Sequence, residues 1–138
     1  MREKLVYSVE SYEALGGRLS SLLGGEVGSV ERRRFPDGER YLRLRSDVRG
    51  RDVVLVGGTP TEGDTLELFD LASGIVKYGA RSLSLVVPYF GYATMERATD
   101  AGEIVTAKNR ARLLSSIPQA DAPNRIFLLD AHTEGLPY

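Results

Sequence analysis

The residues best suited to chemistry follow two apolar stretches of the chain. Residues 83–87 are Leu-Ser-Leu-Val-Val and lead into a polar, glycine-containing loop, and residues 126–129 are Ile-Phe-Leu-Leu and lead into Asp130 and His132. Continuous apolar runs of this length are typical of buried strands. In open α/β sheets, ligands bind beyond the carboxyl ends of the strands. We therefore expect both strand ends to lie on one rim and to form a common anion-binding site.

The only histidine of the chain, His132, stands two residues after Asp130. If strand geometry continues past residue 129, the two side chains point to similar sides. A carboxylate and an imidazole at a strand end suit Mg²⁺ or a phosphate group, and the alternative is a structural histidine. The loop 92–103 also has two interpretations, since its three acids and one arginine could hold a nucleotide or simply face solvent.

Two further segments contain residue types that bind anions. Residues 35–39, Phe-Pro-Asp-Gly-Glu, form a common turn sequence, and eight arginines against three acids lie between Arg32 and Arg51. Guanidinium groups suit phosphate oxygens, although the same arginines could form a solvated face or an interface. Residues 57–64 lie between a strand and a helix N-terminus, where free N–H groups attract anions. They lack the Gly-Lys-Ser/Thr of a Walker loop, so we interpret them as a structural loop.

The composition indicates one globular domain. The 138 residues are 42% hydrophobic and 27% charged, with a formal net charge of −1. No overall field therefore attracts the protein to nucleic acid or to an anionic membrane. The chain has no cysteine, which excludes disulfides, thiolate metal sites and a thiol nucleophile. No apolar run reaches the roughly 18 residues of a transmembrane helix, and no signal-peptide pattern opens the chain. We expect a cytoplasmic protein without nucleic-acid or membrane partners.

The predicted elements define an α/β fold. Four apolar segments are predicted to be strands, at residues 4–9, 52–58, 82–89 and 125–129. Three helices lie between them, with predicted caps at Ser11, at Asp64 in a capping box with Glu67, and at Thr106. Such connections favour a mostly parallel sheet. Segments 27–34 and 40–45 flank a turn and predict an antiparallel hairpin with a basic outer face. We expect a single domain over residues 1–138.

Taken in order, these segments resemble the amino-terminal half of ribose-phosphate diphosphokinase, a family also called phosphoribosyl diphosphate (PRPP) synthetase. The most specific match is Val-Pro-Tyr-Phe-Gly-Tyr-Ala at residues 87–93. The other matches are Phe35-Pro36-Asp37-Gly38-Glu39, Val48-Arg49-Gly50 followed by Asp52-Val53, Asp64 with Leu66, Gly102-Glu103-Ile104 with Thr106-Ala107-Lys108, and Asp130 with His132. The resemblance covers most of the chain from about residue 30 onward.

This resemblance implies a phosphoribosyltransferase-like fold in an enzyme that transfers the diphosphoryl group of ATP, with Mg²⁺, to ribose 5-phosphate. It implies that Phe35, Asp37 and Glu39 contact adenine across a subunit boundary, so we expect a homo-oligomer. It also implies that His132 lies beside the ATP phosphates as a catalytic and metal-binding residue. Asp130 shares that strand end and is the second expected metal ligand.

The chain departs from the family where ATP is held. After the Tyr-Phe-Gly-Tyr-Ala segment the family usually has Arg-Gln and then an acid, and here Thr94, Met95 and Glu96 occupy these cofactor-binding positions. Losing the guanidinium removes a charge-assisted phosphate contact worth about 1.5–3 kcal/mol. Gly57-Gly58 replaces a glutamine-serine pair, and Asp47 stands where a serine usually helps to bind regulatory phosphate.

The second half of the family's sequence is absent from the 138 residues. It carries an acidic loop that binds ribose 5-phosphate and a basic catalytic loop. Because the chain stops soon after a predicted buried strand, we expect it to be part of a longer protein and inactive alone. The rival hypothesis, favoured by Thr94 and Met95, is a non-catalytic homologue that acts as a regulatory or oligomerisation subunit. The simplest alternative is an α/β interaction domain with chance motifs.

Overall fold

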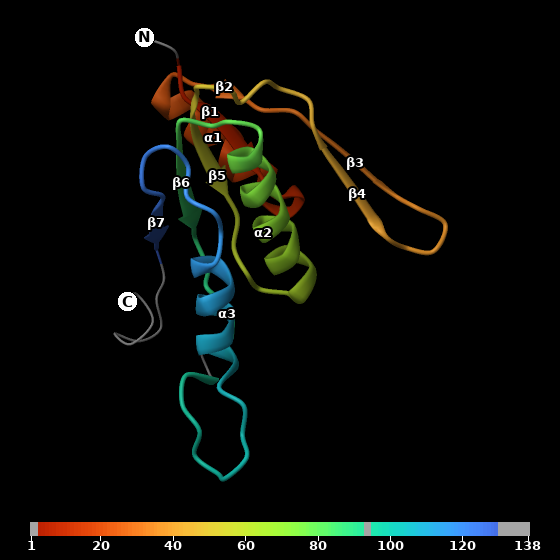
Figure 1. The fold of residues 1–138 in the computed structure, drawn as a ribbon, viewed down its shortest axis with the longest axis vertical. Coiled ribbons are helices and arrows are strands. Elements are labelled where there is room, and N and C mark those ends of the chain that lie inside the picture. The colour runs from red at the N-terminus through yellow and green to blue at the C-terminus, as the bar shows by residue number, and fades with distance from the viewer. Residues whose placement is uncertain (1–2, 93–94, 130–138) are drawn as a thin grey trace.

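The chain forms a parallel sheet with helices on both faces and a separate antiparallel hairpin (Figure 1). The computed structural model describes residues 3–92 and 95–129. Its strands are β1 (Leu5–Ser8), β2 (Glu26–Val27), β3 (Val30–Arg34), β4 (Arg40–Leu44), β5 (Asp52–Val56), β6 (Ser82–Val87) and β7 (Arg125–Leu128). Its helices are the 3₁₀-helix η1 (Glu10–Tyr12), α1 (Glu13–Leu23), α2 (Glu62–Lys77) and α3 (Thr106–Ser115). No helix in this part of the chain is both long and apolar enough to cross a membrane.

The main sheet has the strand order β2-β1-β5-β6-β7, and every neighbouring pair is parallel. The connections that contain α1, α2 and α3 supply the crossovers that parallel neighbours require. Strands β3 and β4 pair only with each other and are antiparallel. The predicted fold class, a mostly parallel α/β sheet with one antiparallel hairpin, is confirmed.

The two faces of the main sheet are covered unequally. On one face, Leu55 and Leu85 belong to the same buried cluster as Leu68 of α2. On the opposite face, Val56 packs with Leu19 of α1. Helix α1 contacts β1, β2 and β5, so residues of β6 on that face are only half-buried. The expectation that β6 is buried on both faces was therefore wrong, because one helix does not cover the full width of the sheet.

The last strand, β7, is more exposed than its apolar sequence predicts. Ile126 and Phe127 are 44% and 48% exposed, and Leu129 just beyond the strand is 68% exposed. The reason is its position at the edge of the sheet, where β6 is its only strand partner among the described residues. The sequence correctly predicts a strand here, but the prediction that it is buried was wrong.

The helices begin at residues other than the predicted caps. Thr61 caps α2, since its Oγ1 accepts a hydrogen bond from the Asp64 N–H (3.1 Å) and its hydroxyl donates to the Asp64 carboxylate (2.8 Å). Asp64 is thus inside the first turn, where its charge complements the helix dipole. Ser11 lies in η1 and donates to Asp64 (2.9 Å) rather than capping α1. Thr106 is the first residue of α3, after the N-cap residue Val105.

The hairpin β3–β4 projects from the main sheet (Figure 1). Val30 pairs with Leu44 at its base. At its tip, the Phe35 N–H donates to the Glu39 carbonyl (2.8 Å) and the Gly38 N–H donates to the Phe35 carbonyl (2.8 Å). Gly38 has a φ of 94°, which residues with a side chain rarely adopt. The predicted turn and hairpin are confirmed, but Val27 of the predicted segment 27–34 belongs to β2 of the main sheet, and the hairpin strand begins at Val30.

Candidate functional site

The segments that follow β5 and β6 lie against each other at the carboxyl edge of the main sheet, which we call the rim. The Thr59 N–H donates to the Tyr89 carbonyl (2.9 Å), and the Gly91 N–H donates to the Thr59 hydroxyl oxygen (2.8 Å). Thr59 is fully buried. It therefore holds the chain after β6 in place, which gives the loop 57–64 the structural role that the sequence predicts.

Glycines allow this close approach. A Cβ at Gly91 would lie 2.0 Å from the Thr59 carbonyl oxygen. A Cβ at Gly58 would lie 2.3 Å from the Tyr12 hydroxyl and 2.9 Å from the Tyr89 carbonyl oxygen. A residue with a side chain cannot fit at either position unless the two segments move apart. The shape of the rim thus depends on both glycines.

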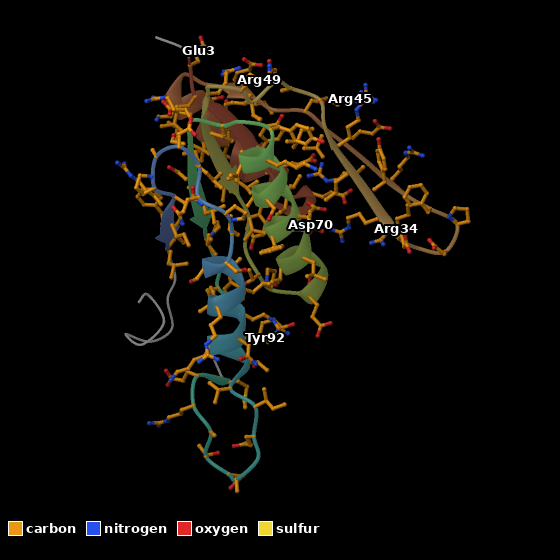
Figure 2. The ribbon with its side chains drawn as sticks, in the orientation of Figure 1. Glu3, Arg34, Arg45, Arg49, Asp70 and Tyr92 are labelled. Carbon is orange, nitrogen blue, oxygen red and sulfur yellow. The ribbon has the colours of Figure 1, made fainter. Side chains whose placement is uncertain are left out.

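Tyr92 lies where the chain leaves the rim and has a cation beside it (Figure 2). Its φ of 67° is the only positive value at a non-glycine residue in the described part of the chain. Such backbone strain is common at functional sites. The Arg110 guanidinium lies 4.5 Å from the centroid of the Tyr92 ring, within the range of a cation–π contact, and Arg110 has no acidic partner among the described residues. Nothing in the local pattern of α3 distinguishes Arg110, so sequence reasoning missed it.

A carboxylate stabilises the turn at residues 99–103, in the loop before α3. Glu103 accepts hydrogen bonds from the Asp100 N–H (2.8 Å), the Thr99 N–H (2.9 Å) and the Thr99 hydroxyl (3.0 Å). These bonds, with that from Asp100 first, lower the pKa of Glu103 because they stabilise the charged form. The contribution of this contact to stability is present above the unfolded-state pKa and is lost as the pH falls through the lowered pKa.

The structure describes part of the predicted ATP-binding segment. Met95 and Glu96 are half-buried just beyond the rim. Thr94, Asp130 and His132 lie outside the described residues. Within residues 3–92 and 95–129, no group of three or more histidine or acidic side chains is placed to hold a metal ion. The Mg²⁺ site expected at Asp130 and His132 therefore stays a prediction.

The end of β7 lies beside the end of β6. The Leu129 N–H donates to the Val87 carbonyl (3.2 Å), which continues the parallel pairing of the two strands. The expectation that both strand ends share one edge of the sheet therefore holds as far as Leu129. The residues next in sequence are those predicted to bind metal.

The residues predicted to contact adenine lie at the hairpin tip, away from the rim of the same chain (Figure 1). Phe35 is 41% exposed, and its ring meets that of Tyr41 edge-on with centroids 5.9 Å apart. The Arg33 guanidinium lies 4.0 Å from the Tyr41 ring centroid. Asp37 accepts a hydrogen bond from the Glu39 N–H (3.0 Å) and so stabilises the turn. The structure does not bring Phe35, Asp37 and Glu39 together with the rim within one chain.

The outer face of the hairpin is basic, and its arginines surround one carboxylate. Glu31 lies 2.8 Å from Arg45, 3.7 Å from Arg33 and 3.8 Å from Arg43, measured between nitrogen and oxygen atoms. Figure 2 shows Arg45 and Arg34 at opposite ends of the hairpin. Exposed pairs of this kind contribute little stability. Because three arginines share one carboxylate, the face keeps a net positive charge, as the sequence predicts.

An open parallel sheet with helical crossovers, a rim of closely packed strand-end loops and one projecting hairpin define an open-sheet α/β protein. The chain belongs to the family of the N-terminal domain of ribose phosphate pyrophosphokinase, whose model matches residues 4–117. Its fold is similar to that of phosphoribosylpyrophosphate synthetase from Mycobacterium smegmatis, with a TM-score of 0.82 and 23% identity. That match covers 98% of this chain and 45% of the solved one.

Two relatives show how much of the longer proteins is present. The chain is 37% identical over 136 residues to ribose-phosphate pyrophosphokinase 2, chloroplastic, of Oryza sativa subsp. japonica, which covers 96% of this chain and 33% of the relative. It is 36% identical over 130 residues to ribose-phosphate pyrophosphokinase of Synechococcus elongatus, which covers 93% of this chain and 38% of the relative. The chain thus spans well under half the length of these relatives.

Replacing Thr59 with valine should loosen the rim. The Thr59→Val variant leaves the buried Gly91 N–H without its acceptor, which costs about 1–3 kcal/mol in the free energy of unfolding. Urea denaturation should show this loss, and hydrogen exchange should show faster exchange of the Gly91 amide. Thr59→Ser keeps the hydroxyl and should preserve the protection of Gly91. Equal exchange in the two variants would contradict the role assigned to the hydroxyl.

Proposed function

We propose that this chain acts as the amino-terminal domain of a ribose-phosphate diphosphokinase. In the full-length enzyme it would help to transfer the diphosphoryl group of ATP to the anomeric hydroxyl of ribose 5-phosphate, which forms PRPP and AMP. The family match over residues 4–117 is the observation that carries this proposal. Because the chain spans 33% and 38% of two relatives, we expect residues 1–138 to be inactive alone. A cytoplasmic location is part of the proposal.

In this proposal the rim receives the phosphates of ATP. Diphosphoryl transfer depends on positioned cations and hydrogen-bond donors more than on covalent catalysis. Arg110 is a cation at the point where the chain leaves the rim, 4.5 Å from the Tyr92 ring centroid. In the sequence, Thr94, Met95 and Glu96 come just after Tyr92. We assign these three residues to the ATP site, with Arg110 as a nearby source of positive charge.

Mg²⁺ accompanies ATP in the proposed reaction, and when bound it neutralises charge on the phosphates. We assign Asp130 and His132 to the metal and His132 to the catalytic contact with the phosphates. Carboxylate oxygens suit Mg²⁺. The support for this placement is that Leu129, immediately before Asp130, is hydrogen-bonded to the end of β6.

A second copy of the chain would supply the adenine contacts. Phe35, Asp37 and Glu39 lie at the hairpin tip, away from the rim of their own chain (Figure 1). An isolated two-stranded hairpin is marginally stable and benefits from packing against another surface. We therefore propose a homo-oligomer in which the hairpin of one subunit reaches the rim of another.

A chimeric enzyme distinguishes a catalytic role of this chain from the role of a non-catalytic regulatory subunit, which Thr94 and Met95 favour. In this chimera, the chain replaces the matching part of the Synechococcus elongatus relative. We expect AMP formation that requires both Mg-ATP and ribose 5-phosphate, and its loss in the same chimera carrying His132→Ala. Circular dichroism and light scattering check that both proteins fold and assemble like the relative. A folded, assembled chimera that releases no AMP would support the regulatory subunit instead.

Restoring the family's ATP-binding pair should strengthen nucleotide binding. We expect the double variant Thr94→Arg, Met95→Gln to bind Mg-ATP about 10- to 100-fold more tightly than the parent chain, because a charge-assisted hydrogen bond contributes about 1.5–3 kcal/mol. Titration calorimetry measures both affinities, and Ser115→Arg, which adds the same charge at the exposed end of α3, serves as the control. Low-micromolar affinity of the parent chain would contradict the proposed weak site.

The oligomer should depend on the hairpin tip. Light scattering of the parent chain should give a mass above the 15.1 kDa of one copy. Phe35→Asp places a charge on the exposed tip and should lower that mass, whereas Ser21→Asp on the exposed side of α1 should not. A parent chain that remains monomeric at high concentration would be evidence against assembly through the hairpin.

A further inference from the structure

A buried carboxylate contacts the hairpin at its middle and near its tip. Glu67 projects from α2, and its side chain is only 5% exposed. One carboxylate oxygen accepts a hydrogen bond from Arg40 of β4 (2.9 Å). The other accepts from the Glu10 N–H (2.7 Å) and from Arg32 of β3 (3.3 Å). The sequence predicts Glu67 as the capping-box partner of Asp64, but its carboxylate is occupied by these longer-range contacts.

These contacts connect both strands of the hairpin to the main domain through one side chain. Arg32 also donates to the Ser8 carbonyl at the end of β1 (2.7 Å) and to the Glu13 carboxylate of α1 (2.8 Å). The Arg32 and Arg40 side chains are 16% and 26% exposed, so neither pair is a freely solvated surface contact. We call Glu67, Arg32 and Arg40 the clamp.

Apolar packing attaches the hairpin to the main domain only in part. Val30, Leu42 and Leu44 pack against the main core, and an open groove of about 610 Å³ lies between residues 41–48 and α2. Asp70 of α2 lines this groove (Figure 2), and burial raises the pKa of its carboxyl while Arg40 opposes the shift. The groove leaves part of residues 41–48 without packing against α2, so polar contacts supply part of the support for the hairpin.

The charged groups of the clamp are better suited to fixing the orientation of the hairpin than to stabilising the folded state. A buried ion pair loses hydration on both partners, so its net contribution to stability is small, whereas its loss leaves uncompensated buried charge. Guanidinium groups also bind carboxylates through donors with fixed directions. Two arginines from adjacent strands bind one carboxylate, and together they define the angle between the hairpin and the main domain. A single contact would not define this angle.

We propose that Glu67 is a positioning residue: its carboxylate, bound by Arg32 and Arg40, fixes the direction in which the hairpin leaves the domain and thereby places the tip for nucleotide binding. The last step rests on the proposed function. The first step is a property of the chain itself and can be measured without nucleotide.

Glu31 provides a matched control. It also has several arginine neighbours, Arg33, Arg43 and Arg45, but all of them lie in or directly next to the hairpin. Glu31→Gln therefore removes a carboxylate of the same kind without breaking any contact to the main domain. Glu67→Gln removes the charge from the clamp while it keeps the shape of the side chain.

The experiment measures a distance between the hairpin tip and α2. The chain has no cysteine, so Pro36→Cys and Lys77→Cys provide two unique sites for spin labels. Pulsed electron paramagnetic resonance should give one narrow distance distribution in the doubly labelled parent and in its Glu31→Gln form. Glu67→Gln should broaden and shift the distribution. A folded Glu67→Gln protein with an unchanged distribution would overturn the proposal.

If Glu67→Gln fails to fold by circular dichroism, variants of the more exposed Arg40 carry the test. Arg40→Gln should broaden the distribution, and Arg40→Lys should restore most of it. Equal distributions in both Arg40 variants and the parent would overturn the proposal.

Mg-ATP titration of unlabelled chains in the Thr94→Arg, Met95→Gln background tests the link to nucleotide. If Glu67→Gln weakens Mg-ATP binding and Glu31→Gln does not, the result supports the link between the clamp and the nucleotide. Equal Mg-ATP affinity in the two variants overturns it. Absence of binding in every chain, with the distances still sensitive to Glu67, would instead refute the proposed ATP site.

Discussion

The pair of hydrogen bonds from the Thr59 backbone and hydroxyl to residues 89–91 is the constraint on which the candidate site depends. It brings the ends of two parallel strands within hydrogen-bonding distance and leaves no room for a Cβ at Gly91. Because Thr59 is fully buried, water cannot replace these hydrogen bonds unless the loops separate. The rim is therefore fixed at its base, while the loop before α3 extends away from it (Figure 1). Met95 and Glu96 stand close to the junction between the two.

The main sheet and the hairpin are held by different forces. The sheet buries apolar side chains against α2 and α3 on one face and against α1 on the other. The hairpin shares only part of that core and is also joined to α2 by the charged contacts of Arg32 and Arg40 to Glu67. Several of the arginines that suggest a phosphate site in the sequence, such as Arg32 and Arg40, therefore form ion pairs within the chain. Arg110, which lies far from that basic stretch in the sequence, is a cation beside Tyr92 at the rim.

Features that depend on local pattern were predictable from the sequence. The strands, the turn at residues 35–39 and the order of elements follow from apolar runs and from turn residues with restricted backbone geometry. The caps were not, because Thr61 and Asp64 both have side chains that can cap α2, and Ser11 donates to Asp64 instead of capping α1. The clamp at Glu67 and the contact of Arg110 were also missed, since each joins residues that are distant in the sequence. The burial of β7 depends on what covers a sheet edge, which composition does not reveal.

The base of the hairpin also bears on how the chain folds. Ser29 donates its N–H to the Ser46 hydroxyl oxygen (3.0 Å), and Tyr7 donates its hydroxyl to the Ser46 carbonyl (2.9 Å). Strands β1 and β5 are neighbours in the sheet although α1 and the whole hairpin lie between them in the chain. The entropy lost in joining two strands rises with the length of free chain between them. If the hairpin forms before β1 and β5 pair, its residues no longer count as free chain between the two strands. The entropy lost when β1 and β5 pair is then smaller.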